Sequence, residues 1–396
     1  MLSGGVTLPW GFRAAGVEAG IKAKGLDLAL LVSDRPATAA AVFTTNLAQA
    51  APVLVSRDHL ARTGGQARAI VVNSGCANAC TGDAGVEVAH GMAAAAAALV
   101  DCPVDHVLVA STGVIGVALS LEKIRQGLPQ AMAALDVDQG AAAARAIMTT
   151  DPFPKESAAR VSIGGRDIAI GGMAKGSGMI EPMMATMLGF VTTDAALPAA
   201  LLDRALRDAV HDTFNAITVD GECSTNDCVM ILANGASGVT VDEATYEVFA
   251  DALRTVCLAL ALGIVRGGEG ATKLITVTVT GGASAADARR AAKAMANSLL
   301  VKTAIHGGDP NWGRLIAVAG RAGVAFDLNR AAVMIGTIVL FKDGRPYDQA
   351  APEAANYLRN DDITITVNLG AGTAMSTVWT CDLSAEYVRI NAEYRT

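Results

Sequence analysis

The stretch GGMAKGSGMIEPMMATMLGFVTTDAAL, residues 171–197, sets a lysine among glycines and then runs through Ala185 and Thr186 into an apolar segment. The residues after Thr186 are the β-branched and aromatic types of a buried strand. If the peptide bond before Thr186 is cut, the new N-terminal residue carries nucleophile and base together, because its α-amine can deprotonate its own hydroxyl. A threonine at the start of a strand is also a common packing residue, so the spacing alone leaves both interpretations open.

The chain before this stretch alternates apolar β-rich runs with alanine-rich helices. Residues 159–165 and 166–172 are expected as a hairpin that leads into it. We also expect strands near residues 26–33, 40–44, 51–55, 68–73 and 106–110. We expect helices near residues 84–100, 119–134 and 139–147. This alternation predicts a layered α/β protein.

The chain after Thr186 continues with a strand and with helices near residues 197–212 and 243–265. A domain boundary is expected near residue 280, because Ser284 and Asp287 are spaced as a capping box that starts a new helix. The last third contains the strand-like runs AVMIGTIVLF, DITITVNLG and AMSTVWTCDL and a short final helix. We therefore expect a main α/β sandwich with the active site in residues 1–280 and a smaller C-terminal α/β lobe in residues 281–396.

Composition limits the partners of this chain. A net charge of −7 and an isoelectric point of about 5.3, without a basic cluster, argue against nucleic acid. The longest apolar run, VCLALALGIV at residues 256–265, is shorter than the ~18 residues that a membrane span needs. The N-terminus lacks the pattern of a secretory signal, and seven cysteines, an odd number, favour reduced thiols. We expect a cytoplasmic protein that acts on small molecules and binds neither nucleic acid nor membrane.

Motifs of the common metal, nucleotide and nucleophile sites are incomplete. The sequence contains no HExxH, and Cys76 and Cys80, spaced i, i+4, are interpreted as buried thiols beside a turn. The glycines and lysine of residues 267–273, GGEGATK, lack the spacing of a phosphate loop. Ser177 is not in a GxSxG elbow, and His306 has no partner that the sequence places. We expect no metal and no bound cofactor.

Several long polar motifs are typical of one enzyme family. They are VNSGCANACTG, ASTGVIG, AIMTTDPFPKE, GGMAKGSGMIEPMMATML, TFNAITVDGECSTND, RGGEGATKLI and VKTAIHGGDPNWGR. With these motifs in this order, the sequence closely resembles the ornithine acetyltransferase family, the glutamate N-acetyltransferases of arginine biosynthesis, over essentially its whole length. The resemblance implies self-cleavage at Ala185–Thr186 into an α chain of residues 1–185 and a β chain of residues 186–396. Thr186 would then take the acetyl group from N2-acetylornithine and pass it to L-glutamate in a ping-pong cycle.

The resemblance also implies roles for individual residues. Thr112 and Gly113 match the oxyanion-hole pair, whose donors face the negative charge of the tetrahedral intermediate. The family's substrate-binding positions match Thr150, Lys175, Thr186, Glu269, Asn391 and Thr396. A lysine such as Lys175 can pair with a substrate carboxylate, and a carboxylate such as Glu269 suits the cationic δ-amine of ornithine.

The fold that the resemblance implies is an α/β (α+β) layered sandwich of the ornithine acetyltransferase and N-terminal-nucleophile aminopeptidase type, with the smaller C-terminal lobe. The α and β chains are expected to stay associated as a homo-oligomer of αβ units. No cofactor is implied, although some family members also accept acetyl-CoA as a co-substrate. The alternatives are a same-fold aminopeptidase or amidase, a related acetyltransferase of a secondary-metabolite pathway, and an uncleaved scaffold protein.

Overall fold

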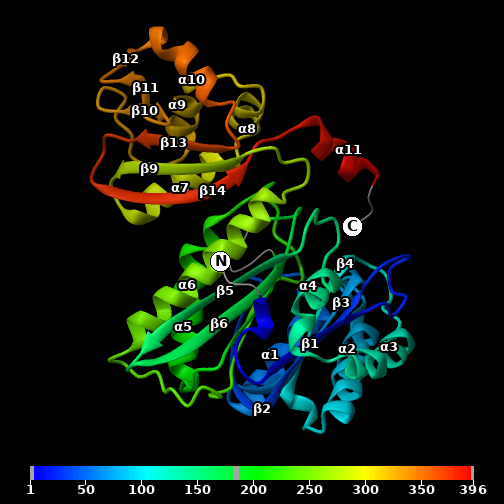
Figure 1. Ribbon diagram of the computed structural model, residues 1–396. Coiled ribbons are helices and arrows are strands. Elements are labelled where there is room, and N and C mark those ends of the chain that lie inside the picture. Colours follow the sequence, from blue (N-terminus) through cyan, green and yellow to red (C-terminus); the bar gives the residue numbers. More distant parts are fainter. Residues whose placement is uncertain (1–3, 182–186, 394–396) are drawn as a thin grey trace. The chain divides into compact units, whose positions relative to one another are not determined.

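The computed structural model describes residues 4–181 and 187–393 and divides into two compact units, coloured mainly blue to green and yellow to red in Figure 1. The first unit comprises Met1–Asn215 and Glu222–Ile264. The second unit comprises Ala216–Gly221 and Val265–Arg395. Each unit has its own sheet and its own buried core.

The first unit is built on a mixed sheet with the strand order β4-β3-β2-β8-β7-β6-β5, and β1 pairs with β2. Its strands are β1 Phe12–Val17, β2 Leu28–Phe43, β3 Gln66–Cys76, β4 Val107–Val114, β5 Lys155–Ile163, β6 Arg166–Lys175, β7 Leu188–Thr193 and β8 Cys228–Ala233. The pairs β3–β4 and β7–β8 are parallel, and the other neighbours are antiparallel. Its helices are α1 Ala51–Thr63, α2 Gly82–Val100, α3 Leu121–Ala133, α4 Gly140–Ala146, α5 Ala199–Asp212 and α6 Tyr246–Arg266.

The first unit is layered because alternate residues of its strands face different cores. Helices α1, α2 and α3 cover one face of β1 to β4. The opposite face enters a second core, in which Phe12 and Leu31 lie in one cluster with Phe190 and Met230 of β7 and β8. Helix α6 lies beyond β6, where a Cβ added to Gly172 would be 2.8 Å from Leu260 Cδ1. Helices therefore pack against the sheet on both sides of the core that its strands share, which agrees with the predicted layered α/β sandwich.

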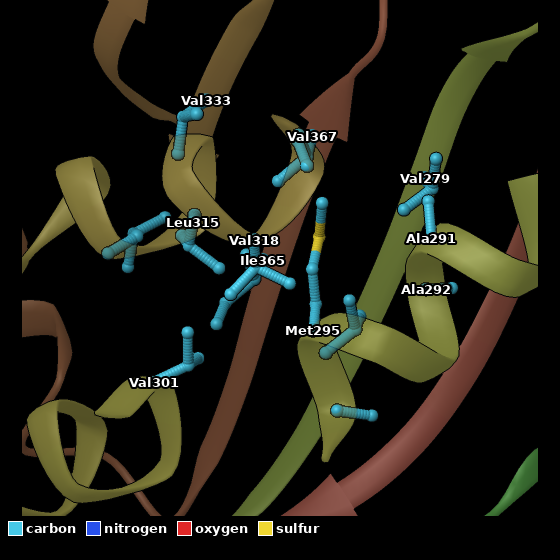
Figure 2. Close-up of a cluster of buried hydrophobic side chains, with 14 of the residues drawn as sticks. Val279, Ala291, Ala292, Met295, Val301, Leu315, Val318, Val333, Ile365 and Val367 are labelled. Carbon is cyan, nitrogen blue, oxygen red and sulfur yellow. The ribbon is translucent and has the colours of Figure 1, made fainter. Parts of the chain in front are cut away.

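The second unit has a sheet with the strand order β12-β11-β10-β13-β9-β14. Its strands are β9 Leu274–Gly282, β10 Ala332–Ile335, β11 Ile338–Lys342, β12 Arg345–Pro346, β13 Asp362–Asn368 and β14 Ala374–Cys381. Its helices are α7 Ala285–Ala296, α8 Leu299–His306, α9 Trp312–Arg321, α10 Ala351–Tyr357 and α11 Ala385–Glu393. Figure 2 shows its core, where Met295 of α7 lies with Ile365 of β13 and Val318 of α9.

One predicted strand is wrong. Residues 51–55 begin helix α1, whereas the run APVLV was interpreted as a strand from its β-branched residues. Pro52 sits in the first turn, where the missing N–H costs nothing, and Gly64 ends the helix with a φ of 62°. Ala51, Val55 and His59 are spaced four residues apart on one face of the helix and are buried. Burial of this face outweighs the preference of valine for strands.

The boundary between the two units also differs from the one expected near residue 280. The longer segment of the second unit begins at Val265 and includes β9. This strand pairs parallel with β13 and antiparallel with β14, so its hydrogen bonds belong to the second sheet. The helix that follows it starts as predicted, because Ser284 Oγ accepts a hydrogen bond from Asp287 N at 3.1 Å.

Two helices in the described part of the chain, α2 and α6, are long and apolar enough to cross a membrane by length and composition alone. Helices in protein cores pass the same test. Helix α2 buries Met92 and Ala96 against the first sheet, and α6 buries Val256 and Leu260. Both helices therefore have faces that are already covered by protein.

Candidate active site

The end of β4 carries Thr112 and Gly113. Gly113 lies opposite Gly75 of β3 and has a φ of 130°, which favours glycine. A Cβ built on Gly113 would lie 2.4 Å from the Gly75 carbonyl carbon and 2.6 Å from the Cys76 nitrogen. The two strands therefore meet backbone to backbone at the predicted oxyanion pair, and no larger residue fits there.

Gly113→Ala is expected to lower the free energy of unfolding, because alanine would meet both an unfavourable φ and the backbone of β3. The backbone conformation alone costs about 1–3 kcal/mol, and the clash adds to it. Gly116→Ala is the matched control, since Gly116 has a φ of 76° but a Cβ there meets no atom within 4 Å. Urea unfolding followed by circular dichroism measures both variants. Equal losses would contradict a tight contact between β3 and β4.

Lys175 is the last residue of β6, and its ammonium group reaches the end of β4. The residue is 8% exposed, and Nζ donates a hydrogen bond to Thr112 Oγ1 at 3.3 Å. The structure thus joins two predicted site residues that are 63 positions apart in the chain. A buried cation is held beside the predicted oxyanion pair.

Asp151, which sequence reasoning missed, is the centre of the polar cluster beside Lys175. Its Oδ1 accepts hydrogen bonds from Lys155 Nζ at 2.5 Å and Gly176 N at 2.7 Å, and its Oδ2 accepts one from Thr149 N at 3.1 Å. Burial alone would raise the pKa of Asp151, but the charges of Lys175 and Lys155 and the hydrogen bonds from Lys155 and Gly176 hold it below its ordinary value. The carboxylate therefore stays ionised and ties the loop before β5 to the end of β6.

Thr150 lies in the same cluster. Its Oγ1 is in hydrogen-bond contact with Ser177 Oγ at 2.6 Å. Lys22 lies between β1 and β2 and donates a hydrogen bond from Nζ to Met148 O at 3.1 Å. Burial lowers the pKa of its ammonium group. The sequence analysis did not single out Lys22, which ends the run GFRAAGVEAGIK at residues 11–22. Thr112, Thr150 and Lys175 are thus brought into one polar region of the first unit.

Three predicted residues, Ala185, Thr186 and Thr396, lie outside the described residues. The described chain resumes at Met187, one position before β7. All residues of β7 are buried, and the strand lies between β6 and β8, with its first residue paired to Lys175. The segment after the predicted nucleophile is therefore the expected buried strand, and it starts beside the lysine of the site.

Buried amide and hydroxyl groups fix the end of β4. Ser111 Oγ donates to Asn73 Oδ1 at 2.6 Å, and Asn73 Nδ2 donates to Cys76 O at 2.9 Å. Asn226 Nδ2 donates to Ser111 O at 2.9 Å and to Ala77 O at 2.6 Å. Sequence reasoning missed these supports. The available signal was a polar residue inside an apolar strand pattern, which burial makes costly unless it is hydrogen-bonded.

The second unit brings Glu269 and Asn391 together. Glu269 is 7% exposed, and its Oε2 accepts a hydrogen bond from Asn391 Nδ2 at 2.8 Å. Ser384 Oγ donates to Gly270 O at 2.6 Å, and a Cβ on Gly270 would lie 2.5 Å from Tyr387 N. Helix α11 is therefore packed closely on the loop that carries Glu269.

His306 has a partner that the sequence did not reveal. Its Nδ1 is 2.7 Å from Asp382 Oδ2, and the Asp382 side chain is fully buried. Thr272 donates to Asp382 from its hydroxyl at 2.5 Å and from its amide at 2.8 Å, and Lys273 N donates at 2.9 Å. Burial would raise the pKa of Asp382, but the hydrogen bonds from Thr272 and His306 and from the two amides hold it low. This network holds the loop after Glu269.

The cysteines do not form a ligand set. Cys76 is buried as expected, but Cys80 is exposed, so the interpretation of both as buried thiols is wrong for Cys80. Cys80 lies two residues before α2 and has a φ of 57°. Among the described residues, no group of three or more His, Cys, Asp or Glu side chains could hold a metal ion.

The whole chain is similar to known proteins. The ArgJ family profile matches residues 13–396. The chain is 51% identical over 403 residues to the arginine biosynthesis bifunctional protein ArgJ of Symbiobacterium thermophilum, a match that covers 100% of this chain and 99% of the relative. The protein of the same name from a Synechococcus species is 50% identical over 408 residues, covering 100% and 98%.

Solved structures give similar matches. The crystal structure of the arginine biosynthesis bifunctional protein ArgJ from Bacillus halodurans has a TM-score of 0.50 and 44% identity, covering 52% of this chain and 98% of that chain. Ornithine acetyltransferase complexed with ornithine, from Mycobacterium tuberculosis, has a TM-score of 0.42 and 43% identity, covering 47% and 98%. The fold, the buried polar site and the similarity of the whole chain define an acyltransferase of arginine biosynthesis. The chain belongs to the ArgJ family.

Proposed function

We propose that the chain is a glutamate N-acetyltransferase that carries the acetyl group of N2-acetylornithine to L-glutamate through an ester on Thr186. Self-cleavage at Ala185–Thr186 would free the α-amine of Thr186. This amine takes the proton of the Thr186 hydroxyl as the oxygen attacks the acetyl carbonyl, and ornithine leaves with that proton on its α-amine. The amino group of glutamate then attacks the ester and regenerates the hydroxyl. Membership of the ArgJ family supports this reaction.

The observation that carries the proposal is the contact between Lys175 and Thr112 beside Gly113. Because the Thr112 hydroxyl accepts a hydrogen bond from Lys175 Nζ, its own proton is left to donate to a developing oxyanion. The N–H of Gly113 supplies the second donor of the proposed pair. Donors that are fixed before the reaction stabilise the transition state without reorganisation.

Glu269 and Asn391 are proposed to bind the side chain of ornithine. Glu269 is a nearly buried carboxylate whose Oε2 already accepts the Asn391 amide, which fixes its orientation. A cationic δ-amine is the partner that such a carboxylate favours, since hydrogen bonds between opposite charges are about twice as strong as neutral ones. Thr150 and Thr396 are proposed as further substrate-binding residues.

Glu269→Gln is expected to raise the KM for N2-acetylornithine by about tenfold or more, because a charged hydrogen bond contributes about 1.5–3 kcal/mol. The KM for glutamate, which has no δ-amine, should change less. Steady-state kinetics with each substrate varied in turn separates the two. The control is Glu386→Gln, which removes an exposed partner of Arg389 on α11. An equal rise in both KM values for Glu269→Gln would argue against a contact with the δ-amine.

Two features support a two-chain enzyme. The match to the solved ArgJ chain of Bacillus halodurans covers 98% of that chain but only 52% of this one. The solved chain is therefore about half as long as this chain, which is the length expected for one product of a cut at Ala185–Thr186. Strand β6 precedes the proposed cut and β7 follows it, and they pair from Ile170 opposite Thr193 to Lys175 opposite Leu188. We therefore propose that the α and β chains stay associated. A homo-oligomer of αβ units and a cytoplasmic location belong to the same proposal.

A second acetyl donor is also proposed. The relatives from Symbiobacterium and Synechococcus are named bifunctional proteins. Acetyl-CoA could acylate the same Thr186 hydroxyl, after which glutamate would take the acetyl group from the ester as before. On this proposal acetyl-CoA is a co-substrate and no bound cofactor is needed.

Incubation of the wild-type protein with N2-acetylornithine, in the absence of glutamate, tests the proposal. Denaturing mass spectrometry should show two chains, of which the one that begins at Thr186 gains one acetyl group while ornithine is released. Addition of glutamate should remove this acetyl group and yield N-acetylglutamate. Loss of the acetyl group to water at the same rate without glutamate would favour the amidase alternative, and one uncut, unmodified chain would favour the scaffold alternative.

A further inference from the structure

Asp227 occupies a buried position next to the start of β7. It immediately precedes β8 and is 2% exposed. The next residue, Cys228, donates from its backbone nitrogen to Met187 O at 3.0 Å, as β7 and β8 run parallel. Asp227 therefore lies beside Met187, the residue that follows Thr186 in the chain.

One oxygen of the Asp227 carboxyl group, Oδ2, is buried without a hydrogen-bond partner among the described residues. An ionised carboxylate could not remain in this state cheaply, because a buried charge needs compensating donors. Burial raises the pKa of Asp227 well above its ordinary value, and the hydrogen bond from Ser224, the charge of Lys175 and the amides of Ser224 and Met187 offset this only in part. These surroundings favour the protonated form of the carboxyl group, with its proton on the oxygen that lacks donors.

The residue before Asp227 links the same segment to the oxyanion strand. Asn226 Nδ2 donates to Ser111 O at 2.9 Å, directly before Thr112. Asn226 and Asp227 thus touch both the end of β4 and the start of β7. Because Asn226 and Asp227 are consecutive, they fix the distance between the end of β4 and the start of β7. The proposed oxyanion donors lie at the end of β4, and the proposed nucleophile precedes Met187 in the chain.

We propose that Asp227 is a further positioning residue of the acetyl transfer: a neutral carboxylic acid that accepts the Met187 amide and so fixes the start of β7. This inference rests on the proposed function. Neutrality has a chemical reason, because a nearby anion favours the protonated form of an amine and so prevents it from acting as a base, and the proposed base belongs to the residue before Met187 in the chain. A neutral acid can accept the Met187 amide without that penalty, and other active sites also keep buried carboxylic acids neutral.

Asp227→Asn and Asp227→Ala test this role. Asparagine is a neutral isostere that can accept from the Met187 N–H and donate from its own amide, so self-cleavage and kcat should stay within about tenfold of wild type. Alanine removes acceptor and donor, and kcat should fall by about 100-fold or more. An asparagine variant as defective as the alanine variant would mean that Asp227 acts as an anion, and full activity in both would mean that it has no role. Either result overturns the proposal.

An infrared measurement keeps the proposal falsifiable if Asp227→Ala does not fold. Wild type at pH 7 should show the C=O stretching band of a protonated carboxylic acid, and Asp227→Asn should lack it. Absence of this band in wild type overturns the proposal. Asp194→Asn is the control, since Asp194 is also buried but its oxygens accept from Ala169 N at 2.9 Å and Trp10 N at 3.1 Å. It should leave the band and kcat unchanged. Wild type that forms no acetyl ester would refute the proposed function instead, while the band still reports on Asp227.

The pH dependence of stability gives an independent readout. The unfolded carboxyl group titrates near about 3.9, and the folded group above that value, so the native state keeps a proton that the unfolded chain has lost. The contribution of Asp227 to the free energy of unfolding is therefore fully present below the unfolded pKa and is lost as pH rises through the folded pKa. Asp227→Asn should abolish this loss. The ionisable groups acting on Asp227 are Lys175 of β6 and the Cys228 thiol of β8, whose pKa burial and Asp227 both raise. The same slope in wild type and variant would overturn the proposal.

Discussion

Thr186→Ala is expected to leave one chain of 396 residues and to abolish acetyl transfer. Alanine has no hydroxyl to attack the preceding carbonyl group, so the bond between residues 185 and 186 stays intact and no acetyl ester can form. Turnover should fall by about 10⁴-fold or more, as it does when a nucleophile is removed from a catalytic unit. Denaturing mass spectrometry should resolve wild type into two fragments that meet at this bond and the variant into a single mass.

Thr186→Ser is the matched variant, because serine keeps both the hydroxyl and, after cleavage, the α-amine. It should still give two fragments and a measurable rate of transfer, since the chemistry needs these two groups and the methyl group of threonine takes no part in it. If Thr186→Ala is also recovered as two fragments, another residue or a contaminating protease makes the cut. The N-terminal threonine would then lose its basis as the self-cleaving nucleophile.

The helices and strands with a clear period could be predicted from the sequence. The helix expected near residues 84–100 is α2, Gly82–Val100, and the strand near 68–73 is the centre of β3. The errors arise where tertiary context decides. The strands expected at 26–33 and 40–44 form one strand, β2, because its register with β3 shifts between Val32 and Ala37 without breaking the ladder. The run AVMIGTIVLF is instead divided into β10 and β11 by Gly336, which has a φ of 61°.

The site could be predicted only as far as a residue type can be matched to a motif. The contact of Lys175 with Thr112 joins β6 and β4, which are not neighbours in the strand order of the sheet, and no local pattern of the sequence contains it. Asp151 and Asp227 were missed for a physical reason. An aspartate in a sequence is ordinarily a solvated charge, and only burial reveals that one of them is an ionised partner of lysines and the other lacks donors for one oxygen.

Asp151→Ala is expected to lower the free energy of unfolding by about 3–5 kcal/mol, because it leaves the Lys155 ammonium group buried without its partner. The side chains of Lys155 and Asp151 are 2% and 0% exposed. The variant also removes the acceptor of the hydrogen bonds that the Gly176 and Thr149 amides donate to Asp151 in the native structure. The measurement is urea unfolding followed by circular dichroism, in the uncut Thr186→Ala background so that unfolding does not depend on protein concentration.

Asp203→Ala is the control for this loss. Asp203 and Arg207 have the same i, i+4 spacing and a 2.7 Å contact, but their side chains are 42% and 52% exposed. Water screens that pair, so its loss should cost about 0–1 kcal/mol. The double variant Asp151→Ala/Lys155→Met removes the stranded charge and should recover part of the loss, although the two amides remain unpaired. If Asp151→Ala costs no more than Asp203→Ala, water must reach the Lys155 ammonium group, and the cluster that holds Lys175 beside Thr112 would owe its geometry to the packing of β5 and β6.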